Sequence, residues 1–123
     1  MGFRVIDTDG WAYSAKKGVD VVVEIKGARC GIEFKYDRMS EQTGNVCIDL
    51  DSINKTTSAI WIYGLPNGGR IDCYTMQVKD LAPFARGWPN KKRVGEFSLE
   101  CALIPKSTFV SQTFIKKWKT IEV

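Results

Sequence analysis

The sequence predicts an α/β domain with a mixed central β-sheet and a few short flanking helices. Three observations predict this class. First, 123 residues with 44% hydrophobic and 26% charged content are typical of one soluble globular domain. Second, β-branched and alternating runs recur along the chain, as expected of strands. Third, residues 78–86 and a stretch containing Phe114, Ile115 and Trp118 have the character of short helices.

Taken in order, residues 1–17 give only a weak helix signal at 14–17, and the strongest pattern is a hairpin at 18–38. Its strands are expected at 19–26 and 32–36, with Lys26 opposite Gly31. Alternation then separates an apolar face from a charged face. The charged face contains Asp20, Val22, Glu24, Lys26, Glu33, Lys35 and Asp37. Like charges on neighbouring strands repel, so such a face is left in solvent or holds a cation.

The remaining elements follow from alternation and turn residues. A polar connector at 37–44 leads to a strand at 46–50, where Asn45, Cys47 and Asp49 share one face. The further expected elements are a polar turn at 52–58, a strand at 59–63, a turn at 65–69, a strand at 70–77, a helix at 78–86, a basic loop at 88–93, a strand at 96–104 and the final helical stretch.

Composition excludes several kinds of chemistry. The chain has no histidine, which removes Ser-His-Asp and Cys-His catalysis and every histidine-based metal site. Its four cysteines are widely spaced without a Cys-x-x-Cys pair, which predicts reduced thiols and no zinc site. No apolar run is long enough to span a membrane, and no signal-peptide core is present. The net charge of +4 mildly favours an anionic partner.

One ordered set of residues resembles a known signature. Asp20 opens one strand, and Glu33-Phe34-Lys35 lies on the next, as in the PD-(D/E)xK nuclease superfamily. Together with the step from Thr43 through Asn45, the segment 18–63 is similar to small phage-type endonucleases and Holliday-junction-resolvase-like proteins. The resemblance implies a restriction-endonuclease-like fold in a single domain covering 1–123, and a phage-encoded or bacterial cytoplasmic protein. The proline of the signature is absent, since Val19 precedes Asp20.

The resemblance also implies the chemistry. Asp20 and Glu33 would bind Mg²⁺ or Mn²⁺, and the backbone carbonyl of Phe34 would add a third oxygen. Lys35 would orient the attacking water or stabilise the developing negative charge. The accessory candidates at this site are Glu24, Asn45 and Asp49.

DNA is the expected partner, and cutting both strands of a duplex needs two sites, which favours a homodimer. Arg38 follows the strand of Lys35 directly, and a basic run stands beside an aromatic residue, a combination suited to phosphates and bases. The residues predicted to contact nucleic acid are therefore Arg38, Trp88, Lys91, Lys92 and Arg93.

Three alternatives remain open on the sequence. Glu24-Ile25-Lys26 is a second Glu-x-Lys, whose leading acid would be Asp7 or Asp9. The same two aspartates suggest an RNase H-like arrangement, with Asp49 and Asp72 as the further acids. The third alternative is that the chain is a non-catalytic nucleic-acid-binding or assembly module. This interpretation is favoured by the weak signal for an N-terminal helix and by the lack of a clear acidic residue on that helix.

Overall fold

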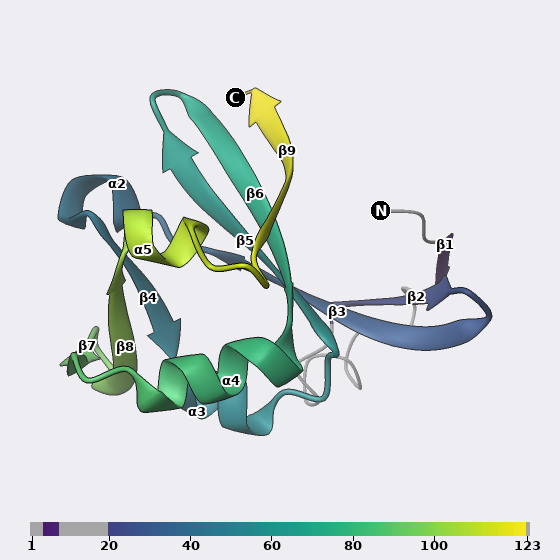
Figure 1. Cartoon of the computed structure of the whole chain (residues 1–123), viewed down its shortest axis with the longest axis horizontal. Helices are drawn as coiled ribbons and strands as arrows, with labels where there is room; N and C mark the ends of the chain where they lie inside the picture. Colours follow the sequence, from purple (N-terminus) through teal and green to yellow (C-terminus); the bar gives the residue numbers. More distant parts are fainter. Residues whose placement is uncertain (1–3, 8–19, 123) are drawn as a thin grey trace.

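The computed structural model describes residues 4–7 and 20–122, which form two β-sheets and short helices (Figure 1). The larger sheet has six strands in the order β1 (Arg4–Asp7), β2 (Val21–Ile25), β3 (Ala28–Tyr36), β5 (Ile60–Asn67), β6 (Arg70–Gln77) and β9 (Lys116–Glu122). The smaller sheet has the order β4 (Asn45–Asp49), β8 (Leu99–Pro105) and β7 (Lys91–Val94). The helices are α2 (Ser40–Thr43), α3 (Leu50–Lys55), α4 (Val78–Gly87) and α5 (Lys106–Val110).

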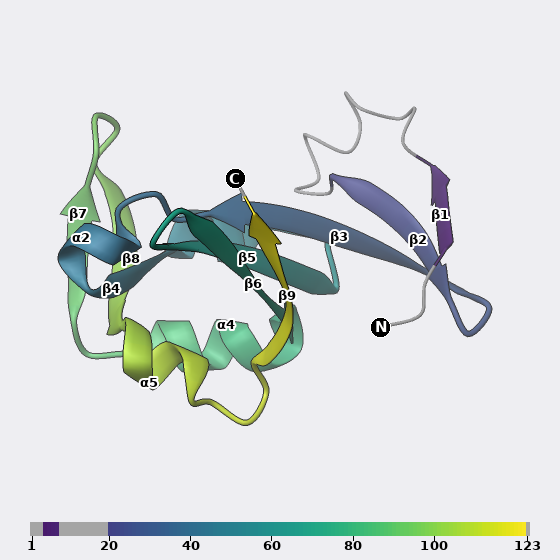
Figure 2. The same cartoon turned by 90° about the horizontal axis from the view of Figure 1, so that it is seen from above.

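The larger sheet is mixed because β3 and β5 run parallel, whereas its other neighbouring strands are antiparallel. The connection between β3 and β5 contains α2, β4 and α3, so it leaves the large sheet and contributes a strand to the small one. Seen from above, α4 and α5 lie on one side of the large sheet (Figure 2). The predicted class, an α/β domain with a mixed central sheet and short helices, is confirmed.

The β2–β3 hairpin differs from its predicted register. A two-residue turn at Lys26 and Gly27, with φ of 50° and 80°, joins the strands and sets Ile25 opposite Ala28. Positive φ at both positions is the geometry of the type I′ turn, whose twist suits a hairpin. The longer predicted loop and the pairing of Lys26 with Gly31 are therefore wrong. The residues predicted to share a face still share one, because the register differs from the predicted one by an even number of residues.

Several other boundaries also differ from those predicted. The polar segment expected to be a turn forms α3, and the expected basic loop contains β7. The C-terminal stretch forms β9 instead of a helix, because it pairs with the edge of β6 from Arg70↔Glu122 to Thr75↔Lys116. Trp118 packs against an apolar cluster on the sheet, so tertiary contacts override the local helical pattern. Asp9 and the predicted helix at 14–17 lie outside the described residues.

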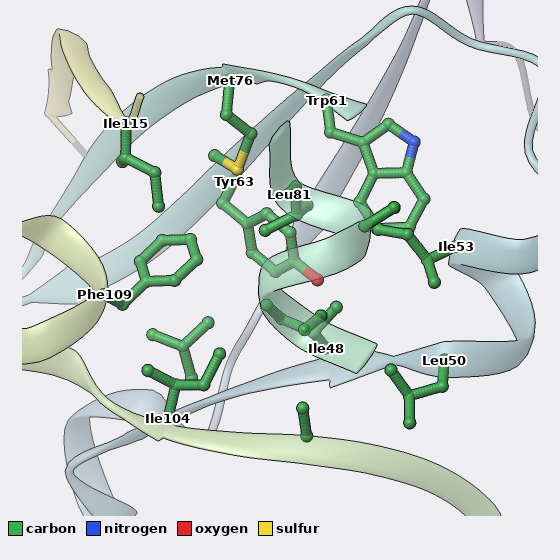
Figure 3. Close-up of a cluster of buried hydrophobic side chains, with 14 of the residues drawn as sticks. Ile48, Leu50, Ile53, Trp61, Tyr63, Met76, Leu81, Ile104, Phe109 and Ile115 are labelled. Atoms are coloured by element: carbon green, nitrogen blue, oxygen red, sulfur yellow. The ribbon is translucent and has the colours of Figure 1, made fainter. Parts of the chain in front are cut away.

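The main hydrophobic core lies between the large sheet, the small sheet and the helices (Figure 3). From the large sheet, β5 contributes Trp61 and Tyr63, and from the small sheet β4 contributes Ile48. Leu81 of α4 and Phe109 of α5 close the core, and all five side chains are at most 2% exposed. Burying a large apolar side chain stabilises a fold by about 1.5–3 kcal/mol, so this cluster fixes β4 relative to β5.

A second cluster lies on the opposite face of the large sheet. Val23, Ile32 and Ile62 are its buried residues together with Cys73, which confirms part of the apolar face predicted for the hairpin, whereas Phe34 and Tyr36 of that face are exposed. All four cysteines lie in the described part of the chain as free thiols. Among the described helices, none has the length and apolar character needed to cross a bilayer.

Candidate active site

Asp20 and Glu33 lie next to each other at the start of the hairpin. Asp20 directly precedes β2, whose register begins with Val21 opposite Ile32, and its charge acts on the carboxyl of Glu33. The backbone N–H of Asp20 donates to the Ile32 carbonyl at 2.9 Å. One carboxylate oxygen of Asp20, Oδ2, accepts a hydrogen bond from the backbone N–H of Phe34 at 2.7 Å. The observed register therefore brings together the two acids that the predicted register had placed four residues out of step.

Glu33 points toward the main core and is only 7% exposed. Its direction follows from its pairing with Trp61, because paired residues on neighbouring strands share one face. Its Oε2 atom lies 2.8 Å from Nζ of Lys35 but makes no hydrogen bond of regular geometry within the described residues. Burial raises the pKa of the Glu33 carboxyl; Lys35 opposes this shift, and the charges of Asp20 and Asp49 add to it.

Lys35 sits between this carboxylate and an aromatic ring. Its Nζ lies 4.9 Å from the centre of the Trp61 ring, a cation–π contact, and its side chain is 30% exposed. The ring is fully buried, so it gives the lysine a rigid support. The intervening Phe34 points to the other face, where it is 47% exposed.

Asp49 ends β4 and caps the next helix. Its Oδ1 accepts hydrogen bonds from the backbone N–H groups of Asp51 and Ser52, and its Oδ2 accepts one from the Ser52 hydroxyl at 2.9 Å. Asp49 is half-buried, and its charge contributes to the raised pKa of Glu33. The small sheet thus brings Asp49 close to the acids of the hairpin, while three of its acceptor positions stabilise α3.

A cleft of about 370 Å³ opens between β3 and β4, and we call it the acid cleft. It is lined by Lys35, Tyr36, Asp37, Arg38, Met39, Cys47, Asp49 and Tyr63. Asp37, absent from the predicted site, ties the two strands together, because its Oδ2 accepts from the backbone N–H of Cys47 at 2.7 Å. Its position directly after the strand of Lys35 is the sequence signal that marks it.

The Thr43-Gly44-Asn45 step ends α2 and begins β4. Gly44 adopts φ of 75°, and its N–H closes the helix on the Ser40 carbonyl. The Thr43 hydroxyl accepts from the backbone N–H of Asn45 at 3.1 Å and lies 3.0 Å from the Met39 carbonyl, to which it donates. This turn positions β4, so its part at the site is the placement of Asn45 and, further along the strand, Asp49.

The donor atoms suit a divalent cation, although nowhere in residues 4–7 and 20–122 do three Asp, Glu or Cys side chains form a ready-made metal cluster. Glu33 Oε2 is buried and lacks a regular hydrogen bond, and two further carboxylates raise its pKa. Among the described residues, Asp20 keeps acceptor capacity beyond its bond to Phe34, since a carboxylate offers about four lone-pair positions. Carboxylate oxygens are the ligands that Mg²⁺ prefers, so these residues fit such an ion.

Two acids of the alternative arrangements, Glu24 and Asp72, lie away from this pair. Glu24 is opposite Arg29, which places it four residues, or about 13 Å, along β2 from Asp20. Asp72 is buried on β6, two strands away from β3 in the large sheet, where it accepts hydrogen bonds from Asn67 and Thr120. Both residues are therefore separated from the pair formed by Asp20 and Glu33.

The residues predicted to contact nucleic acid fall into two groups in the structure, those that make contacts within the protein and those that line a cleft or pocket. Trp88 is half-buried, with its indole N–H donating to the Leu103 carbonyl at 2.7 Å and its ring against Phe84. Because 91–94 form a strand, Lys92 points to the opposite face from its two basic neighbours. Lys91 donates to the Trp88 carbonyl, and Arg93 to the Ser98 carbonyl.

Two of the predicted basic contacts remain beside the candidate site. Arg38 is exposed and lines the acid cleft, and Lys92 lines a neighbouring pocket. Comparisons of the chain with protein-family models, with curated proteins and with solved structures gave no match.

Proposed function

We propose that this chain is a metal-dependent nuclease that hydrolyses DNA phosphodiester bonds. The observation that carries the proposal is the meeting of Asp20, Glu33 and Lys35 on one face of the hairpin, with Asp49 brought alongside by the small sheet. Paired carboxylates and a lysine beside an open cleft are the groups that phosphodiester hydrolysis requires when histidine is absent.

In this proposal Asp20 and Glu33 hold Mg²⁺ or Mn²⁺, with the Phe34 carbonyl as a further oxygen ligand. Such an ion supplies an activated water and neutralises charge on the phosphate. The chain contributes a rigid, partly desolvated carboxylate. Burial of Glu33 strengthens its electrostatic interactions, and the ion pair with Lys35 offsets part of the cost of burying the charge.

Lys35 is proposed to stabilise negative charge that develops during the reaction, or to orient the attacking water. Its ammonium is already close to the carboxylate of Glu33 and is supported by Trp61. It also lines the acid cleft, so a phosphate bound there would meet it directly. Electrostatic groups that are fixed before the reaction need no reorganisation in the transition state.

The proposed partner is DNA, held by Arg38 at the acid cleft and by Lys92 beside it. Contacts of this kind bind phosphates without reading sequence. Free thiols agree with a reducing compartment, for which we propose the cytoplasm of a bacterial host. A homodimer would supply the two sites that double-strand cleavage needs.

A second function, a non-catalytic nucleic-acid-binding module, is favoured by one observation. Asp49 uses both of its oxygens to cap α3, and Glu33 is already paired with Lys35. A fold that retained these residues for structure alone would show the same contacts. Such a module would bind DNA through Arg38 and Lys92 but would leave phosphodiester bonds intact.

Digestion assays separate the two functions. Plasmid, single-stranded circular DNA and a branched four-way junction are incubated with the protein in Mg²⁺ or in EDTA. We expect cleavage in Mg²⁺ that disappears in EDTA and in Glu33→Gln. Retained binding of all three DNAs with no cleavage of any of them in either Mg²⁺ or Mn²⁺ would overturn the nuclease and leave the binding module.

A further inference from the structure

A second pocket adjoins the acid cleft along the outward face of the small sheet. It has a volume of about 510 Å³, within the range of pockets that bind small organic groups. Asp37, Met39 and Cys47 line both hollows, so the two are continuous. A chain molecule whose phosphate lies in the acid cleft would therefore have its neighbouring unit in or beside this pocket.

The walls of the pocket are mostly apolar, with polar groups at a few points. Met39, Val94 and Leu103 supply apolar surface, and burial raises the pKa of the Cys47 thiol strongly, so this side chain is neutral. Asn45 adds a side-chain amide, which offers both hydrogen-bond donors and an acceptor. A flat aromatic ring with polar edges matches such a lining better than a purely aliphatic group does.

The pocket is lined by one cation and one carboxylate, Lys92 and Asp37, and the carboxylate of Asp37 already accepts a hydrogen bond from the backbone N–H of Cys47. Lys92 shares a strand face with Val94, since its two basic neighbours point the other way. Arg38 lies on the side of the acid cleft. Cations at both ends of a mostly apolar hollow suit a nucleotide, whose base is apolar on its faces and whose phosphates extend on either side.

We propose that this pocket binds an unpaired nucleobase of single-stranded DNA, next to the phosphate held in the acid cleft. A base inside a duplex is paired and stacked, so it cannot enter without being extruded. The inference rests on the proposed function for the position of the phosphate, and it names the substrate class: DNA with at least one unpaired nucleotide at the cleavage point.

The test is binding of a fluorescein-labelled single-stranded oligonucleotide, measured by anisotropy in EDTA so that no cleavage occurs. An abasic nucleotide is moved through the oligonucleotide one position at a time. We expect one position to weaken binding by about tenfold, because the abasic nucleotide loses the apolar contacts of its base with the pocket wall. The blunt duplex of the same sequence should bind at least about tenfold more weakly than the single strand.

Two variants connect the effect to the pocket. Met39→Ala and Leu103→Ala each remove part of the apolar wall, so each should weaken binding of the intact oligonucleotide. Each should also reduce the loss of affinity caused by the abasic nucleotide, because that loss depends on contact between the base and the wall side chain. Phe97→Ala is the matched control, since Phe97 is 80% exposed and lies outside the pocket. Circular dichroism melts verify that each variant is folded.

The outcomes distinguish this inference from the nuclease itself. No sensitive position, an abasic penalty unchanged in both wall variants, or equally tight duplex binding would overturn the base pocket, even if Mg²⁺-dependent cleavage is found. A position-dependent penalty that disappears in Met39→Ala supports the pocket, even if every digestion assay fails and the nuclease is rejected.

Discussion

The Oε2 atom of Glu33 lies 2.8 Å from Nζ of Lys35, and this ion pair stands at the margin of the main core. Two residues apart on β3, the side chains share one face and are separated by Phe34, which points away. Breaking a partly buried ion pair by removing one partner leaves the other charge poorly solvated.

Glu33→Gln should eliminate Mg²⁺-dependent cleavage, because it keeps the size of the side chain but removes the charge that holds the metal. Glu24→Gln should leave most of the activity, since Glu24 lies opposite Arg29 and away from Asp20. Initial cleavage rates on one DNA substrate measure both. Loss of activity in Glu24→Gln together with full activity in Glu33→Gln would mean that the motif has been assigned to the wrong strand.

Lys35→Met should reduce the cleavage rate by at least about 100-fold while changing DNA affinity little, because the lysine acts on charge that develops in the transition state. Methionine keeps an unbranched apolar stem against Trp61, so the fold is expected to persist. Single-turnover cleavage and anisotropy binding separate the two effects. A parallel loss of binding and cleavage would make Lys35 a phosphate anchor instead.

Mn²⁺ should stabilise the protein against heat, because the crowding of Asp20 and Asp49 around Glu33 is relieved by a cation. At a concentration of 100 times Kd the gain would be about 2.7 kcal/mol. The raised pKa of Glu33 also determines how this stabilisation depends on pH. A proton on the Glu33 carboxyl competes with the metal, so the stabilisation by Mn²⁺ should decrease as pH falls through that raised pKa. Calorimetric melts in EDTA and in millimolar Mn²⁺ measure it, with Glu33→Gln as the control that should not respond.

Strand alternation predicted correctly which residues of the hairpin share a face. Asp20, Glu33 and Lys35 do so in both the predicted and the observed register, because the register moved by an even number of residues. The register itself depends on the turn at Lys26 and Gly27. A Lys-Gly pair lacks the Asn-Gly or Asp-Gly signal of a type I′ turn, so its positive φ at Lys26 was not predictable from the sequence.

Other parts of the site depend on contacts that no local pattern encodes. Asp49 approaches Glu33 because the connection between β3 and β5 enters a separate sheet, and sequence spacing gives no sign of that path. The aromatic and lysine residues around Trp118 fit an amphipathic helix equally well. These residues form a strand because they pair with the edge of β6.

Asp49→Asn should preserve folding and still lower activity. Asparagine caps helices about as well as aspartate, so the free energy of unfolding should change by less than about 0.5 kcal/mol, whereas Asp49→Ala should lose about 1 kcal/mol. The charge beside Glu33 disappears in both variants. Urea unfolding and cleavage rates are the measurements. Full activity in Asp49→Asn would confine Asp49 to its capping role in α3.

The stability of the large sheet should depend on pH through Asp72. Hydrogen bonds from Thr120 and Asn67, and the nearby charge of Lys117, lower the pKa of this buried carboxyl and connect β6 to β9. A lowered pKa means that the ionised group stabilises the folded state. That contribution is complete above the ordinary aspartate pKa of about 3.9 and is lost as pH falls through the lower value in the folded protein.

Asp72→Asn therefore provides a pH-resolved test of this link between the strands. Hydrogen bonds to charged groups contribute about 1.5–3 kcal/mol, so the variant should be less stable than the parent by about 1–2 kcal/mol at pH 7, because asparagine keeps one acceptor but loses the charge. The difference should narrow toward zero as pH falls below the lowered pKa of Asp72 in the folded parent, because the parent carboxyl is then protonated as well. Urea unfolding of both proteins across this range isolates the effect, since their other carboxylates are identical. A gap that stays constant with pH would mean that Asp72 contributes by packing and neutral hydrogen bonds alone.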